Sequence, residues 1–230
     1  MCKKLMVLLC LVTSVFFFSA KTPAATAGVD LMLNGTFSSN KQDTQDIASI
    51  SILNIEQAFP EAKFKLDLDV LGGKKSNILG DDTYSGYDLK AGFRAVDSDE
   101  VKLDFTLALY NGTITQTDLY DSGYYDREFA INSGLIGIDL ILNLSDKAFM
   151  EGSVAVSLLA SANTTDKYED GFILTEEVPG NVSLYNYKVK FNYVVADNVA
   201  VSVGYRYYKT SIDLTSTLLS GYTAGLTFNF

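Results

Sequence analysis

The chain has 230 residues, of which 47% are hydrophobic and 12% aromatic, and it carries a formal net charge of −10. A chain this acidic is unsuited to binding nucleic acid, whose phosphates attract basic surfaces. It contains no histidine and only two cysteines, Cys2 and Cys10. The usual general base of a Ser-His or Asp-His site is therefore missing.

The first 27 residues are typical of a secretory signal peptide. Lys3 and Lys4 precede the apolar run LMVLLCLVTSVFFFSA, and the motif ATA at 25–27 supplies a small-x-small cleavage pattern. The run is short for a transmembrane helix, and an uncleaved anchor is the alternative. We expect residues 1–27 to be removed on export across the inner membrane, which leaves residues 28–230 as one domain.

Removal of the signal peptide changes the composition. Both cysteines leave with it, so the exported chain has no disulfide and no thiolate metal site. Three lysines are also removed. The remaining chain has 15 of the 18 Lys and Arg residues and all 28 Asp and Glu residues, so its net charge is near −13. No later stretch approaches the roughly 18 continuous apolar residues of a spanning helix. The sequence predicts no metal ion and no cofactor.

Apolar and polar residues then alternate with a period of two, which predicts strands rather than helices. The cleanest case is KFKLDLDVL at 63–71, where one face is apolar and the other is charged. The same alternation recurs at 29–37, 86–95, 101–110, 135–144, 150–160, 184–194, 199–208 and 221–230. About ten strands result if ASISILNIEQAF at 48–59 is one of them. Alternation breaks there near Leu53, so a bulge or a short helix is the alternative, with eight or nine strands.

The connections between these segments differ in length. Short connectors at 60–61, 97–99, 145–147 and 196–198 alternate with longer polar stretches at 38–47, 72–85, 112–129, 161–182 and 210–217. Tight turns on one rim and long loops on the other are typical of an up-and-down antiparallel meander. We therefore expect an all-β antiparallel barrel.

Two kinds of barrel fit one apolar and one charged face: a secreted lipocalin-like carrier with an apolar lumen, and a transmembrane barrel with an apolar exterior. Small residues accompany the charges on the polar face, as a narrow lumen requires; they are Gly92, Thr106, Ala108, Gly137, Ser153, Ala155, Ser157, Ser202 and Gly204. Tyrosine and phenylalanine gather at the strand ends of the apolar face, as in the interfacial girdles of membrane barrels. The transmembrane barrel is the favoured prediction.

The alternating final strand, with Tyr222, Leu226, Phe228 and Phe230 on one face, together with the signal peptide and the meander, resembles a small bacterial outer membrane β-barrel of the OmpA/OmpX/OmpW-like kind. The resemblance implies the outer membrane of a Gram-negative cell, both termini in the periplasm, and contact with outer membrane lipid and lipopolysaccharide. It also implies that the final strand is a signal for the barrel-assembly machinery.

The polar face predicts a charge network in the lumen, because an unpaired buried charge is costly. Its members nearly balance in sign: Lys63, Lys65, Asp67, Asp69, Asp88, Lys90, Arg94, Lys102, Asp104, Asp139, Glu151, Lys188, Lys190 and Arg206. In the favoured interpretation the network plugs the barrel, which acts as a structural or surface-interaction protein. In the alternative, the barrel is a small porin-like channel with Arg94 and Arg206 at its constriction.

Enzymatic activity is not expected. Small outer membrane barrels with protease, deacylase or palmitoyltransferase activity resemble one another in relying on a histidine, and this chain has none. The pair Asp67 and Asp69 is more typical of a structural strand than of a catalytic site.

The long connections are acidic and carry three neighbouring tyrosines, Tyr120, Tyr124 and Tyr125. They predict a solvated surface, with an extracellular ligand or cation-bridged lipopolysaccharide as the functional alternative.

Overall fold

The computed structural model describes residues 25–39, 48–59, 62–76, 81–120, 123–168, 170–178, 182–212 and 215–230. Within them lie eleven strands: β1 (Ala25–Ser39), β2 (Ala48–Phe59), β3 (Phe64–Ser76), β4 (Asp81–Asp97), β5 (Val101–Tyr120), β6 (Gly123–Ser145), β7 (Ala148–Lys167), β8 (Ile173–Glu177), β9 (Val182–Ala196), β10 (Val199–Ile212) and β11 (Thr215–Asn229). The predicted signal peptide, residues 1–27, lies outside the described residues except for residues 25–27.

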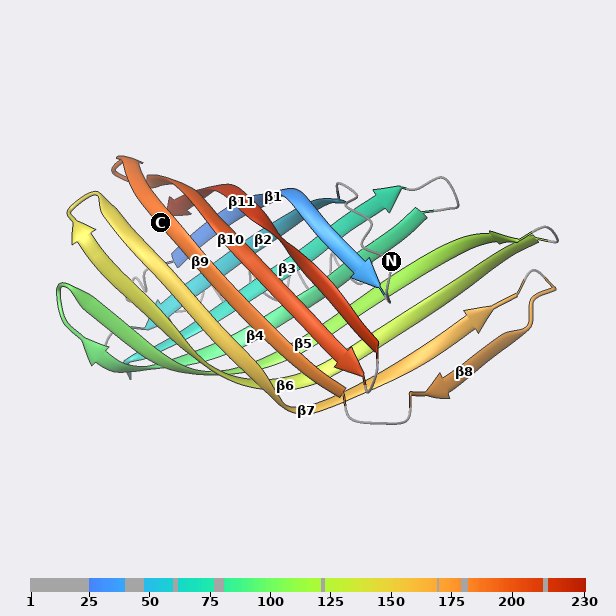
Figure 1. Ribbon diagram of the computed structural model, residues 1–230. Helices are drawn as coiled ribbons and strands as arrows, with labels where there is room; N and C mark the ends of the chain where they lie inside the picture. The colour runs from blue at the N-terminus through green and yellow to red at the C-terminus, as the bar shows by residue number, and fades with distance from the viewer. Residues whose placement is uncertain are drawn as a thin grey trace.

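The strands form a closed antiparallel barrel (Figure 1). Each strand from β1 to β7 pairs with the next, and β7 also pairs with β9. β9 pairs with β10, β10 with β11, and β11 completes the ring by pairing with β1. The ring contains ten strands, because β8 pairs with β7 alone and lies outside it. This confirms the predicted all-β barrel and its strand count.

Ring closure joins the two ends of the barrel-forming chain. Thr26 pairs with Asn229 at one end of the seam and Ser39 with Thr217 at the other. No sheet edge is left within the ring, so every strand in it has a partner on both sides. The short turns at 97–101, 145–148 and 196–199 lie at one end of the barrel, which we call the turn end; the opposite end is the loop end.

The ambiguous segment at 48–59 is strand β2. It pairs continuously with β3 from Ser49 and Lys74 to Phe59 and Phe64, with no register shift. The alternation breaks because Ile50 and Ile52 point into the lumen and are almost fully buried, while Leu53 and Ile55 lie on the outer face. The expectation that lumen-facing residues are polar is wrong at this level of the barrel.

The polar stretches at 112–129 and 161–182 are largely strand, not loop. β5 and β6 pair from Val101 and Leu142 to Tyr120 and Gly123, and β7 continues to Lys167 before β8 folds back on it. Threonine, isoleucine and tyrosine are frequent in these stretches, and such residues favour strands even where charges surround them. β5 to β8 therefore extend beyond the other strands at the loop end (Figure 1).

The outer face carries an apolar band. Phe105, Leu107 and Leu109 on β5 are more than half exposed, and so are Leu31 and Val203 on β1 and β10. Such a surface suits hydrocarbon rather than water. It argues against a lipocalin-like carrier, in which the outer face would be polar.

Tyrosines gather on the outer face of β9, β10 and β11. The Tyr187 and Tyr207 rings lie 5.5 Å apart, as do those of Tyr205 and Tyr222. Tyrosines clustered in this way are typical of the aromatic girdles of membrane barrels. The described part of the chain contains no helix with the length and hydropathy of a membrane span.

Candidate functional site: the barrel lumen

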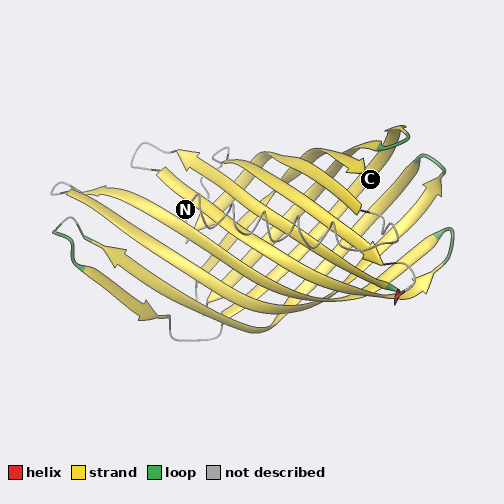
Figure 2. Cartoon of the chain, turned by 180° about the vertical axis from the view of Figure 1, so that it is seen from behind, coloured by secondary structure: helices red, strands yellow, loops and turns green. Residues whose placement is uncertain are grey.

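The lumen is divided into two layers along the barrel. Inward side chains toward the turn end are mostly charged, and those toward the loop end are mostly apolar. Figure 2 shows the same barrel from behind, with its long strands crossing from one end to the other. The charged layer is where the sequence predicts a functional network.

Asp139 of β6 is the most heavily bonded carboxylate of the charged layer. Its Oδ2 lies 2.9 Å from Lys65 Nζ and 3.2 Å from Lys90 Nζ, and its Oδ1 accepts a hydrogen bond of 2.7 Å from the Ser153 hydroxyl. The two lysines come from β3 and β4 and Ser153 comes from β7, so these bonds tie four strands together. All four side chains are buried.

A second bridge joins Asp30 of β1 to Lys190 of β9. The Lys190 ammonium lies 3.1 and 3.0 Å from the two Asp30 carboxylate oxygens. Space for Asp30 comes from Gly225 on β11, where a Cβ atom would collide with the carboxylate. A glycine on β4 plays the same part for Lys65, since a Cβ at Gly92 would lie 2.8 Å from the lysine Cε.

Further toward the loop end, Arg206 of β10 donates to Asp69 of β3. The Asn186 amide of β9 donates across the barrel to Asp88 of β4 at 3.1 Å. The Arg206 guanidinium also lies 4.9 Å from the centre of the Tyr208 ring. Arg206 therefore joins the charged layer to the layer above it.

Arg94 and Arg206 do not form one constriction. Arg94 donates to Asp104 and, at 3.0 Å, to Asp97 in the turn at the barrel end, and its side chain is 19% exposed. Arg206 is 4% exposed and binds Asp69. The two arginines have different partners at different depths.

Two of the predicted network members lie at its edge. Lys63 is exposed in the turn before β3, with a φ of 50°, and does not enter the lumen, because the strand that would alternate it inward begins only at Phe64. Lys102 is half-buried beside Asp97 at the turn end. The structure brings the others into the lumen: Lys65, Asp67, Asp69, Asp88, Lys90, Asp104, Asp139, Glu151, Lys188, Lys190 and Arg206 line it, with Arg94 at its mouth.

Several network members were not predicted from the sequence. Asp30 follows the alternation of the first strand and was detectable from it. Glu56 and Asn54 lie on the ambiguous segment; Asn54 donates to both Asp67 and Asp69, at 2.7 and 2.6 Å. Asn186 has no charge to mark it. These uncharged amides donate further hydrogen bonds to the lumen carboxylates, beyond those that the lysines and arginines donate.

The apolar layer closes the lumen toward the loop end. It contains Met32, Ile50, Ile52, Leu71, Ala108, Ile114, Ile131, Leu135, Ala155, Ala162, Leu184 and Leu219, all buried. The side of this layer that meets the charged layer, which we call its floor, consists of Tyr84, Tyr110 and Tyr208. Tyr84 and Tyr110 share a hydrogen bond, and the Tyr110 and Tyr208 rings lie 6.0 Å apart. At this level the described side chains fill the lumen with apolar groups.

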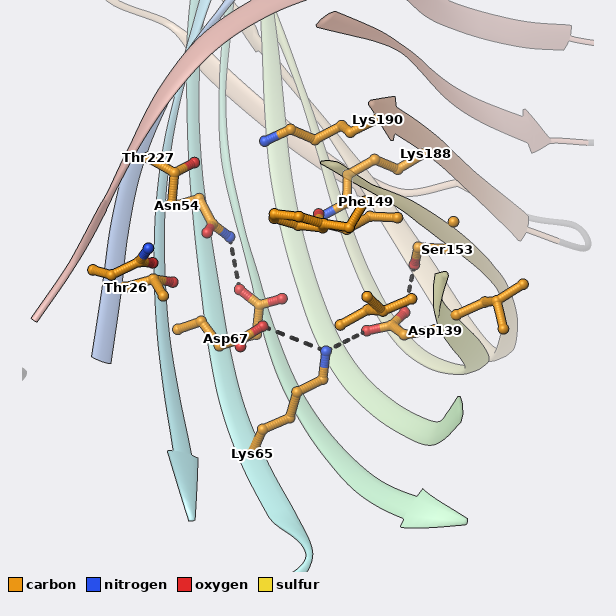
Figure 3. A pocket seen from close by; sticks show the side chains of 16 residues that line it. Thr26, Asn54, Lys65, Asp67, Asp139, Phe149, Ser153, Lys188, Lys190 and Thr227 are labelled. Carbon is orange, nitrogen blue, oxygen red and sulfur yellow. Dashed lines mark hydrogen bonds and ion pairs between the residues drawn. The ribbon is translucent and has the colours of Figure 1, made fainter. Parts of the chain in front are cut away.

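A cavity of about 200 Å³ remains in the charged layer near the turn end (Figure 3). Lysines and carboxylates both line it, among them Lys65, Lys188, Asp139 and Glu151. In Figure 3, Lys65 and Ser153 both bond to Asp139 at its wall, and Asn54 bonds to Asp67. Within the described residues, no three acidic, histidine or cysteine side chains are grouped to hold a metal ion.

The predicted acidic surface lies at the loop end. Arg127 binds Asp166 there through two hydrogen bonds, at 2.8 and 3.0 Å, and Lys167 lies 3.1 Å from Glu128. Part of the acidity is thus neutralised by neighbours on β6 and β7, while Asp170, Glu176 and Glu177 are exposed. The side chains of Tyr120, Tyr124 and Tyr125 lie outside the described residues.

The final strand is placed as the sequence predicts. Tyr222, Leu226 and Phe228 are exposed on the outer face of β11, and Phe230, which follows the strand, is 80% exposed. These side chains continue the apolar band that surrounds the barrel.

Comparison with known proteins identifies the fold. No protein-family model matches the chain, and a search of curated proteins yields no match. Among solved structures, the barrel is similar to the outer membrane protease OmpT of Escherichia coli, with 10% identity, a TM-score of 0.60, and coverage of 90% of this chain and 94% of that one.

Two further barrels are similar at lower scores. The translocator domain of the autotransporter NalP from Neisseria meningitidis shares 12% identity, with a TM-score of 0.46 and coverage of 100% of this chain and 96% of that one. Ail of Yersinia pestis, solved with a heparin analogue, shares 9%, with a TM-score of 0.43 and coverage of 91% and 100%. At 10% identity, the similarity to OmpT shows the fold alone, which is that of a bacterial outer membrane β-barrel.

Proposed function

We propose that this protein is a non-enzymatic, non-conducting outer membrane barrel that acts as a structural and surface-interaction protein. Two observations support the proposal: ion pairs cross the charged layer, and buried apolar side chains pack together in the apolar layer. In this proposal the chain resides in the outer membrane after signal-peptide cleavage, and its finer kinship is with OmpA/OmpX/OmpW-like barrels.

Both layers oppose ion flow for physical reasons. An ion entering the charged layer would have to separate pairs such as Asp30 and Lys190, and breaking a buried pair costs about 3–5 kcal/mol. In the apolar layer it would lose its hydration without gaining a ligand. The absence of histidine removes the base on which a hydrolytic site would rely.

The test is conductance in planar lipid bilayers with refolded protein whose folding is verified by heat-modifiable migration on a detergent gel. We expect no steady current steps. A matched variant, Tyr110→Ala with Tyr208→Ala, removes the floor of the apolar layer and should raise the frequency of openings. Steady ohmic steps from the unmodified protein would instead establish the small porin-like channel.

The surface for interaction is the projecting sheet at the loop end, where β8 is an edge strand. Val178 N–H donates to the Ala162 carbonyl and Tyr168 N–H to the Phe172 carbonyl. Because hydrogen-bonded pairs alternate along an antiparallel ladder, the backbone groups of Ile173, Thr175 and Glu177 point away from β7. Within the described residues β8 pairs with no other strand.

We propose that β8 accepts a basic, extended polypeptide segment as an added strand. Exposed Glu176 and Glu177 supply the complementary charge, and exposed Ile173 supplies apolar contact. Outer membrane lipid, lipopolysaccharide and the barrel-assembly machinery, which would read the final strand, are the other partners in this proposal.

Strand addition predicts a specific proline effect. Thr175→Pro removes an N–H that faces away from β7, so the hairpin should persist while binding of a fluorescent alternating Lys-Val peptide weakens about fivefold to tenfold. Asp170→Asn, which changes a charge beyond the strand, should leave binding nearly unchanged. Equal binding of Lys-Val and Glu-Val peptides, or no effect of the proline, would contradict strand addition.

A further inference from the structure

The cavity in the charged layer contains one lysine and one carboxylate that make no direct ion pair with any described residue. Three lysines line it: Lys65, Lys188 and Lys190. Lys65 lies 2.9 Å from Asp139, and Lys190 lies 3.0 Å from Asp30. Lys188 has no carboxylate within ion-pair distance among the described residues.

A carboxylate in the same cavity is also left without a cation. Glu151 accepts a hydrogen bond of 3.2 Å from the Asn192 amide and makes no ion pair with any described residue. Lys188 and Glu151 are both half-buried and come from the neighbouring strands β9 and β7. Because neither charge is in direct contact with one of opposite sign, the Lys188 ammonium can still donate to a ligand and the Glu151 carboxylate can still accept from one.

The size and charge of the cavity restrict what can bind there. Its volume of about 200 Å³ lies below the roughly 300–1,000 Å³ of sites for drug-sized ligands. A multivalent anion is disfavoured because four carboxylates line the cavity against three lysines. A divalent cation is disfavoured because the described residues offer no group of three metal ligands.

We propose that this cavity binds a small zwitterion of the free α-amino acid type. Its carboxylate accepts from the Lys188 ammonium, and its ammonium donates to the Glu151 carboxylate. The Phe149 ring supplies an apolar wall for the ligand's side chain (Figure 3). Thr227 and Asn229 line the cavity near the end of the final strand, so the ligand enters from the turn end.

The experiment is isothermal titration of the folded barrel in detergent with three probes that share one branched alkyl chain. L-leucine carries both charges, 4-methylpentanoate lacks the ammonium, and 3-methylbutylamine lacks the carboxylate. We expect L-leucine to bind at least about tenfold more tightly than either truncated probe, because each charged hydrogen bond that is lost weakens binding by that order.

Two variants and one control test the assigned residues. Lys188→Met should weaken L-leucine binding about tenfold and make it equal to that of 3-methylbutylamine, whereas Glu151→Gln should make it equal to that of 4-methylpentanoate. Lys147→Met, in an exposed turn, should change nothing. If one variant fails to fold, the other still decides.

Three results would overturn the proposal: no L-leucine binding by the folded protein, equal binding of all three probes, or unchanged binding in both folded variants. None of them bears on conductance, so this proposal and the proposed closure of the lumen fail independently.

Discussion

At the scale of single residues, the lumen depends on a few side chains that serve several partners. Asp139 neutralises Lys65 and Lys90 and also accepts from Ser153. Its charge was predictable from alternation along LIGIDLILNL, but its partners were not. They lie on β3 and β4, and nothing in the local sequence specifies which residues meet across a closed lumen.

Asp139→Ala should be strongly destabilising, because it leaves two buried lysines without their shared carboxylate. We expect the free energy of unfolding to fall by about 3–5 kcal/mol, measured by urea titration in detergent or lipid. Asp146→Ala, in an exposed turn, should change it by less than about 0.5 kcal/mol. Similar values for the two variants would mean that the network adds little to stability.

Glycines give a matched test of the packing around the network. A Cβ at Gly225 would collide with the Asp30 carboxylate, whereas a Cβ at Gly152 meets nothing within 4 Å. Gly225→Ala should therefore lower the free energy of unfolding by about 1–3 kcal/mol, and Gly152→Ala should not lower it. Thermal unfolding of both proteins checks the difference; equal midpoints would contradict the close approach of Asp30.

At the scale of elements, the sequence predicts strands well where the lumen is polar and poorly where it is apolar. KFKLDLDVL is unambiguous because β3 crosses the charged layer. ASISILNIEQAF is ambiguous because β2 also crosses the apolar layer, so Ile50 and Ile52 face inward while Ile55 faces outward. Side chains of β2 still alternate between the two faces of the sheet, but the sequence does not show it, because apolar residues lie on both faces.

The pairing of strand β1 predicts how the site of signal-peptide cleavage affects stability. Residues 25–27 pair with Gln57, Glu56 and Ile55 on β2 and with β11, and Phe230 N–H donates to the Ala25 carbonyl at 2.9 Å. A chain that begins at Gly28, as the ATA motif predicts, lacks these pairings. We expect it to unfold at a lower temperature than one beginning at Ala25, measured on refolded proteins, while intact mass identifies the natural start. Equal unfolding temperatures would mean that the start of β1 adds nothing to the seam.

At the scale of the whole molecule, alternation and turn spacing predict the barrel, its strand count and its outward face. They do not predict whether the lumen is open, because that depends on side chains from strands far apart in the ring, such as Arg206 on β10 and Asp69 on β3. Nor do they predict the projecting sheet, because charged residues interrupt the alternation there, although threonine, isoleucine and tyrosine favour strands.

The seam between β1 and β11 has a kinetic consequence. Its partners, such as Thr26 and Asn229, lie almost a full chain length apart. The conformational entropy lost in pairing them is therefore lost only after the last residues have reached the membrane. Until then the partly assembled sheet has two edge strands whose backbone groups are unpaired on one side. Assembly should accordingly be a late, cooperative event, and a chaperone that shields the first strand would be needed for as long as the last one is missing.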